Sequence, residues 1–171
     1  METIPPIKAT QEVFKPEIKL VEEADIQVLS EIYSRVFSDA DPEKPWDIEH
    51  SKEHLEYWLK IQPDMFFGAF NKNKELMGAI AVSIMPWRRA NRCHAGIIFV
   101  DNKYKNKKIA KTLFRTMLEK AVQKYNATSF EAVTFAGKEF PLNWYKKIGI
   151  NPDEGAVLIK GNCKDIITKL S

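Results

Sequence analysis

Five lysines crowd a short stretch where the hydrophobic pattern places the start of a helix. They stand at positions 103, 105, 107, 108 and 111, at the head of an expected helix over Lys107–Tyr125 with Asn106 as its N-cap. The first turn of a helix carries partial positive charge and unpaired N–H groups, which favour anions over cations. The stretch therefore predicts a site for a bound phosphate or diphosphate. A basic helix face that is open to solvent is the alternative interpretation.

The glycine patterns of nucleotide sites are missing from the sequence. It holds neither the glycine-rich loop ending in Gly-Lys-Ser/Thr that cradles nucleoside triphosphates nor the Gly-x-Gly-x-x-Gly of dinucleotide sites. Their absence argues against a nucleoside-triphosphate or dinucleotide site.

Strand and helix patterns on both sides of the lysines would position this site. Apolar runs predict strands at Ile18–Val21, which we expect at a sheet edge, and at Met65–Phe70, Leu76–Ile84, Cys93–Val100, Ser129–Phe135 and Ala156–Lys160. Helices are expected over Ala24–Phe37, Ile48–Ile61, Lys107–Tyr125 and Pro141–Ile148. Asn71–Lys74 is a hairpin turn in this interpretation, Pro86 ends a strand, and Cys93–Val100 is internal to the sheet. The elements predict an α/β (α+β) fold with a mixed, mostly antiparallel sheet flanked by helices.

Composition limits the class of protein. The chain has 171 residues, 44% of them hydrophobic, and a net charge of +3, which predicts one globular domain, here placed over residues 18–171. The segment before it, residues 1–17, is expected to be a flexible leader. No apolar run approaches the roughly 18 residues that span a bilayer. Cys93 and Cys163 lie seventy positions apart and fit a reducing cytoplasm better than a zinc site or a disulfide framework.

Two motifs resemble the GNAT superfamily of acyl-CoA N-acyltransferases. The family's pyrophosphate loop has the form Gln/Arg-x-x-Gly-x-Gly/Ala, and here Lys105-Asn106-Lys107-Lys108-Ile109-Ala110 matches it, with Lys108 in place of the first glycine. The family's aromatic-Tyr-x-x-x-Gly-Phe pattern appears as Trp144-Tyr145-Lys146-Lys147-Ile148-Gly149-Ile150. The order of elements is similar to the family from about Ile18 to Lys160.

The resemblance implies an enzyme that transfers an acetyl group from acetyl-CoA to a primary amine. The backbone of Ile98, Phe99 and Val100 would pair with the pantetheine arm, and the residues of the loop and helix tip would hold the diphosphate: Lys105, Asn106, Lys107, Lys108, Ile109, Ala110 and Lys111. Tyr145 would be the general acid for the departing thiolate. His94 is a candidate base, because an imidazole titrates near neutral pH.

The acceptor side is less defined by the sequence. By the family's geometry the second helix would border the acceptor cleft, so Trp46, His54, Tyr57 and Trp58 are candidate contacts; ordinary packing is the alternative. His50 and His54 share one face of that helix, but no third metal ligand follows, and we expect no metal. The acceptor amine and the oligomeric state, a homodimer included, stay open.

Other functions remain compatible with the residues. The segment Trp87–Arg92 mixes basic and aromatic side chains, as nucleic-acid contacts often do, and with the lysines it makes an RNA-binding or tRNA-directed module an alternative. A GNAT-like domain that binds CoA without catalysis is another.

Overall fold

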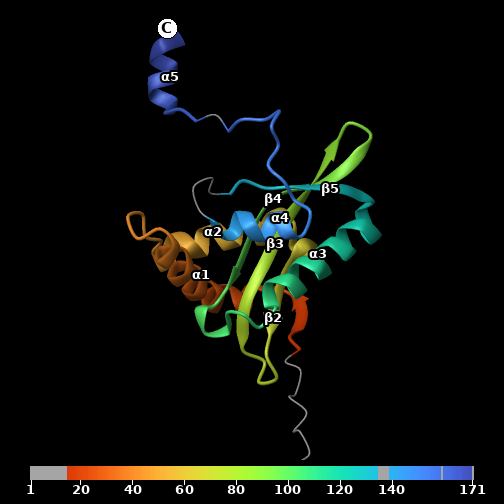
Figure 1. Ribbon diagram of the computed structural model, residues 1–171. Coiled ribbons are helices and arrows are strands. Elements are labelled where there is room, and N and C mark those ends of the chain that lie inside the picture. The colour runs from red at the N-terminus through yellow and green to blue at the C-terminus, as the bar shows by residue number, and fades with distance from the viewer. Residues whose placement is uncertain (1–14, 135–138, 159, 171) are drawn as a thin grey trace, which may run out of the picture. The chain divides into compact units, whose positions relative to one another are not determined.

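The computed structural model describes residues 15–134, 139–158 and 160–170 (Figure 1). The chain divides into two compact units, the first ending at Ala132 and the second beginning at Val133. The expected leader lies mainly outside the described residues, and the expectation of a single domain over residues 18–171 stays a prediction. None of the described helices combines the length and apolar character needed to cross a membrane.

The first unit is built on a five-stranded sheet in the order β1-β2-β3-β4-β5. Its strands are β1 (Glu17–Leu20), β2 (Phe66–Phe70), β3 (Leu76–Trp87), β4 (Ala90–Val100) and β5 (Ala127–Glu131). The first four strands are antiparallel, and β5 runs parallel to β4. The predicted mixed, mostly antiparallel sheet is confirmed, as are β1 at an edge, β4 inside and the hairpin turn after β2.

Helices cover both faces of this sheet. Helices α1 (Ile26–Ala40) and α2 (Ile48–Ile61) share a hydrophobic core with β2, β3 and β4, which includes Leu29, Leu55, Phe66, Ala81 and Phe99. Helix α3 (Ile109–Tyr125) lies on the opposite face, where Phe114 packs edge-on against Phe130 of β5 at 5.0 Å between ring centroids. Short 3-10 turns at Glu23–Asp25, Pro63–Met65 and Asn102–Tyr104 complete the unit.

Strand β3 continues past the proline that we expected to end it. Pro86 pairs with Asn91, and only Arg88 and Arg89 form the hairpin turn, so most of the predicted polar loop Trp87–Arg92 belongs to strands. The hairpin projects beyond the other strands (Figure 1). Strand β2 pairs with β3 only as far as Ala81, so the missing N–H of Pro86 costs no second ladder bond there.

The second unit contains α4 (Glu139–Lys147) and α5 (Cys163–Leu170). Helix α4 was predicted at nearly these residues. The strand expected at Ala156–Lys160 is wrong for its described residues, which form no regular structure. Val157 and Leu158 are exposed there, and no strand of the described chain pairs with them, as a strand requires. The short apolar pattern of α5 did not stand out in the sequence.

Candidate functional site

A buried aspartate anchors the loop that follows β4. Asp101 is 1% exposed, and its N–H donates to the carbonyl of Met77 on β3 at 2.8 Å. Its carboxylate pairs with Arg35 of α1 at 2.8 Å and accepts from the N–H of Lys103 at 3.1 Å. Burial alone would raise the pKa of Asp101, but the hydrogen bond from Lys103 and the charge of Arg35 hold it below its usual value. The loop therefore leaves β4 from a fixed point.

The backbone after this anchor adopts a shape that glycine normally supplies. Asn106 has φ +65° and Lys108 has φ +61°, both in the left-handed region. For a residue with a side chain this conformation costs roughly 1–2 kcal/mol. Lys108 occupies the position of the first glycine in the pyrophosphate-loop pattern that this stretch resembles. The backbone therefore keeps a glycine-type conformation although the residue is a lysine.

Helix α3 begins at Ile109, two residues later than predicted. Lys108, not Asn106, is the N-cap residue, because the left-handed turns at Asn106 and Lys108 hold the preceding backbone out of the helix. No side chain of the described residues caps the helix, and its first turn contains no acidic residue. The first helical bond runs from the N–H of Thr112 to the carbonyl of Lys108 at 3.0 Å, so the N–H groups of Ile109, Ala110 and Lys111 have no partner among the described residues.

The lysines at the tip differ in what they contact. Lys103 forms an ion pair with Asp101 at 3.5 Å, and Lys107 lies over the ring of Tyr104, 5.3 Å from its centroid. Lys105, Lys108 and Lys111 are exposed and have no acidic partner among the described residues. The other predicted loop residues are Asn106, which is exposed, Ala110, which is half-buried, and Ile109, whose side chain belongs to the core. Charge and unpaired N–H groups together fit a bound anion.

The inner half of β4 has an open edge. Strand β5 pairs with β4 only from Asn91 to His94, and the remainder of β4 has no partner on that side among the described residues. Ile98, Phe99 and Val100 lie in this part, each paired with β3 on the other side. An extended ligand could therefore add to the sheet here.

A β-bulge at Ala95 separates the two halves of β4. Val82 pairs with Gly96 while Ser83 pairs with His94, so one extra residue stands in β4. The bulge reverses the alternation of sides, and His94 therefore faces the same side of the sheet as Phe99, toward α1. The pairing of β5 with β4 ends beside this bulge, at His94 and Glu131. We call the region around Arg92, His94 and Glu131 the fork.

The fork carries three charged or titratable side chains, of which Glu131 contacts the other two. Nδ1 of His94 and one carboxylate oxygen of Glu131 form a short hydrogen bond. Arg92 donates to the other oxygen at 2.5 Å and stacks over Trp87, 3.9 Å from the ring centroid. The sequence pointed to His94 as a base and to Arg92 only as part of a possible nucleic-acid segment, and it did not indicate Glu131. The partners lie 37 and 39 residues apart, and no local pattern pairs them.

The predicted acceptor residues lie largely in an aromatic cluster between α1 and α2. Trp46 and His54 both pack against Tyr33, and the Trp58 indole donates to Nε2 of His54 at 3.2 Å. Burial lowers the pKa of His54, so its ring is neutral near pH 7. Tyr57 is 56% exposed and contacts Trp58 of the cluster.

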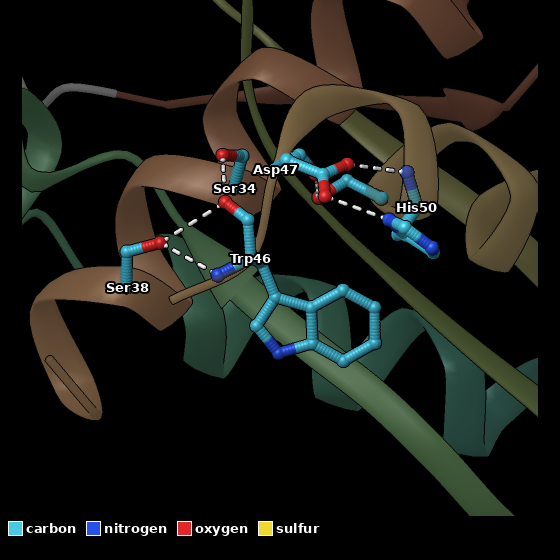
Figure 2. Close-up of polar contacts among 6 residues, drawn as sticks. Ser34, Ser38, Trp46, Asp47 and His50 are labelled. Atoms are coloured by element: carbon cyan, nitrogen blue, oxygen red, sulfur yellow. Dashed lines mark hydrogen bonds and ion pairs between the residues drawn. The ribbon is translucent and has the colours of Figure 1, made fainter. Parts of the chain in front are cut away.

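Polar contacts fix the segment that brings Trp46 into this cluster (Figure 2). The hydroxyl of Ser34 donates to the Trp46 carbonyl at 2.5 Å, and Ser38 accepts from its N–H at 2.9 Å. Asp47 then caps α2 by accepting from the N–H of His50 at 2.8 Å and contacts the His50 ring at 2.7 Å. His50 is therefore engaged at the helix cap. Among the described residues no three His, Cys, Asp or Glu side chains cluster as a metal site would require.

Tyr145 belongs to the second unit. It lies on α4, is 8% exposed, and its burial raises the pKa of the phenol. The helix ends at Lys147, and in the turn behind it Gly149 has φ +87° and its N–H donates to the carbonyl of Lys146 at 3.1 Å. A phenol that stays protonated at neutral pH can donate a proton but is a poor base.

The chain matches one family of known proteins. Residues 26–150 match the family described as the acetyltransferase (GNAT) family. Among curated proteins, none matches the chain significantly.

Several solved structures share the fold. An integron cassette protein from the mobile metagenome of V. cholerae is 16% identical over 91% of this chain and 97% of its own, with a TM-score of 0.69. An acetyltransferase from Trypanosoma brucei is 14% identical over 86% of this chain and 100% of its own, with a TM-score of 0.59. The NatC complex bound to Gag peptide and CoA contributes a chain that is 20% identical, over 79% of this chain and 84% of its own, with a TM-score of 0.60.

Proposed function

We propose that this chain, which belongs to the GNAT acetyltransferase family, transfers an acetyl group from acetyl-CoA to a primary amine. The observation that carries the proposal is the tip of α3, which follows directly after the open edge of β4 and has a glycine-type backbone. Within the described residues, the first N–H groups of α3 have no hydrogen-bond partner, and Lys105, Lys108 and Lys111 have no acidic partner. A diphosphate would accept hydrogen bonds from the N–H groups of the tip and balance the charge of its lysines. An extended pantetheine arm would pair with the backbone groups at the open edge of β4.

The residues fit the two parts of the donor differently. At the tip, the N–H groups of Ile109, Ala110 and Lys111 would hold diphosphate oxygens, while Lys105 and Lys108 add charge. At the open edge, the backbone of Ile98–Val100 would bind the pantetheine amides. A backbone N–H of β4 near the bulge would then polarise the thioester carbonyl. The CoA in the NatC complex is consistent with this use of the fold, although that likeness establishes the fold alone.

Tyr145 is our candidate for the general acid. The amine nitrogen attacks the thioester carbon, the C–S bond breaks, and the sulfur leaves with the electron pair. Tyr145 would give its proton to that sulfur and recover one from solvent, and positioning of the two reactants would supply much of the remaining rate. The raised pKa of this tyrosine keeps the proton available at neutral pH.

Charge reversal at the tip tests the donor site. A Lys107→Glu, Lys108→Glu variant should bind acetyl-CoA on the order of 100-fold more weakly than the parent, and the loss should shrink at high salt because exposed charges are screened. Isothermal calorimetry at two salt concentrations measures it. Lys15→Glu, Lys19→Glu near β1 is a matched control with the same change of charge elsewhere. Parental affinity in the tip variant would refute the docking.

An acceptor panel tests the reaction. Free thiol released from acetyl-CoA is followed with small amines, peptide N-termini, peptides containing lysine and aminoacyl-tRNA. At least one amine should be acetylated, and Tyr145→Phe should lower kcat while acetyl-CoA affinity stays parental. A parent that binds acetyl-CoA but acetylates no amine would instead support a CoA-binding domain without catalysis. The nucleic-acid alternative is less well supported, because Arg92 of the basic hairpin is already paired with Glu131.

We propose a reducing cytoplasm as the site of action. The structure contains two free thiols, Cys93 buried and Cys163 exposed, and an exposed thiol persists best in such a compartment.

A further inference from the structure

The His94 ring at the fork keeps one nitrogen available. An ionised carboxylate only accepts hydrogen bonds, so the contact with Glu131 places the ring hydrogen on Nδ1 and leaves a lone pair on Nε2 when the ring is neutral. Nε2 has no hydrogen-bond partner among the described residues, and 40% of the side chain is exposed. The ring is thus set in one tautomer with its basic atom open.

Glu131 is itself held from two directions. One oxygen receives the His94 hydrogen, and the other receives Arg92, whose guanidinium is fixed in turn by stacking on Trp87. An ion pair that only held β4 and β5 together would need no more than Arg92 and Glu131. The third member, His94, stands at the last paired position before the strands part, on the face of the sheet that α1 covers.

We propose that His94 removes the proton from the acceptor amine, with Nε2 as the accepting atom, and that Glu131 is the residue that positions it. This inference rests on the proposed amine acetylation. Arg92 completes the arrangement by holding the second oxygen of Glu131.

A protonated primary amine must lose two protons when it becomes an amide. The amine arrives as an ammonium ion, one N–H bond breaks, and its proton passes to Nε2 while the electron pair stays on nitrogen. That pair forms the new C–N bond as the C–S bond breaks and sulfur takes its pair. Nitrogen releases a second proton to solvent, the thiolate gains one from the general acid, and His94 returns its own to solvent. The carboxylate of Glu131 keeps its hydrogen bond with Nδ1 and stabilises the imidazolium between these steps.

Glu131→Gln separates this role from simple packing. Arg92 can only donate, so it should keep the amide oxygen of the new glutamine, which turns the amide NH₂ toward His94. Nδ1 must then accept, and the ring hydrogen moves to Nε2, where it blocks the base. The change is nearly isosteric, and a residue that only packed would not shift the tautomer.

Two measurements test the proposal. Nitrogen-15 spectra of the histidine rings should show the Nδ1–H tautomer for His94 in the parent and the Nε2–H tautomer in Glu131→Gln. With an amine that the parent acetylates, His94→Gln and Glu131→Gln should each lower kcat on the order of 100-fold, with KM for acetyl-CoA within about twofold. Glu119→Gln, which breaks an exposed pair with Arg115 on α3, should change neither.

The outcomes distinguish a failure of His94 as the base from a failure of the proposed amine acetylation. If His94→Gln keeps the parental kcat, or the tautomer is unchanged in Glu131→Gln, the pair is not the base and the acetyltransferase proposal still stands. If the parent binds acetyl-CoA but acetylates no amine, both fall. Should Glu131→Gln unfold, the kcat of His94→Gln decides alone.

Discussion

The tip of α3 and the fork between β4 and β5 handle charge in opposite ways. At the tip, Lys105, Lys108 and Lys111 have no acidic partner among the described residues, and the backbone is strained. At the fork, Arg92 and His94 share the two oxygens of one carboxylate. These three lysines have no counter-charge in the described part of the chain until an anion binds, whereas the fork is already paired. A region of the first kind fits ligand capture, and one of the second kind fits a proton acceptor that must be oriented in advance.

The largest effect should follow from filling the space beside the bulge. A Cβ built at Gly96 lies 2.3 Å from the backbone oxygen of Ala81, which cannot move without disturbing β3. Gly96→Ala should therefore destabilise the protein by about 3 kcal/mol and lower Tm by roughly 8 °C. Because the strain falls beside His94, kcat should fall by a larger factor than acetyl-CoA affinity.

A matched glycine gives the baseline for that comparison. A Cβ at Gly155 meets only the Asp153 carboxylate oxygen, at 3.3 Å, so Gly155→Ala should leave Tm nearly unchanged. Differential scanning calorimetry and steady-state kinetics on both variants measure the difference. If Gly96→Ala melts with the parent, the bulge is more pliable than its geometry indicates, and the fork cannot be regarded as preset.

The next largest effect should come from the anchor of the tip. Asp101→Asn removes a buried charge that Arg35 and Lys103 both contact, and it should cost about 2 kcal/mol of unfolding free energy near pH 7. Acetyl-CoA affinity should fall as well, because the loop to the tip starts at this residue. The fork should be spared, so kcat at saturating acetyl-CoA should change little.

The pH dependence of this loss has a defined sign. The pKa of Asp101 lies below its usual value in the folded protein, so its contribution is present above the unfolded pKa and is lost as pH falls through the folded one. Parent and Asp101→Asn should therefore differ fully above about pH 4 and converge in more acid solution. Urea unfolding from pH 7 down to pH 3 tests this, and a constant difference across that range would contradict it.

The tip was open to prediction from the sequence because its signals are local. Helical spacing of apolar residues placed α3, and the run of lysines at its head indicated an anion site without any long-range contact. The error at Asn106 was also local in origin, because the residue type indicates a good N-cap but does not show that Asn106 itself and Lys108 take left-handed φ values.

The fork could not be predicted in the same way. Which residue of β5 meets His94 depends on the register of a parallel pair and on a one-residue bulge, and a shift of one residue would turn the side chain to the other face. The strand expected at Ala156–Lys160 failed for a related reason: an apolar run predicts a strand only if a partner strand exists. The mixed, mostly antiparallel character of the sheet could be predicted, because one hairpin and one helical crossover can be read along the chain.

The smallest effect separates the shape of the tip from its charge. Lys108→Gly should stabilise the protein by about 1 kcal/mol, because it removes the cost of a left-handed lysine, whereas Lys105→Gly, at φ −53°, should destabilise it by about 0.5–1 kcal/mol. Each variant loses one positive charge, so acetyl-CoA affinity should fall about two- to fivefold in both.

Urea unfolding and calorimetry on the two glycine variants measure stability and affinity separately. Opposite changes of stability with equal losses of affinity would show that the lysine charges, and not side-chain support of the loop, serve the donor. If Lys108→Gly is instead destabilised, the Lys108 side chain holds the loop together. The tip would then resemble the fork, a region organised by its own contacts before any ligand arrives.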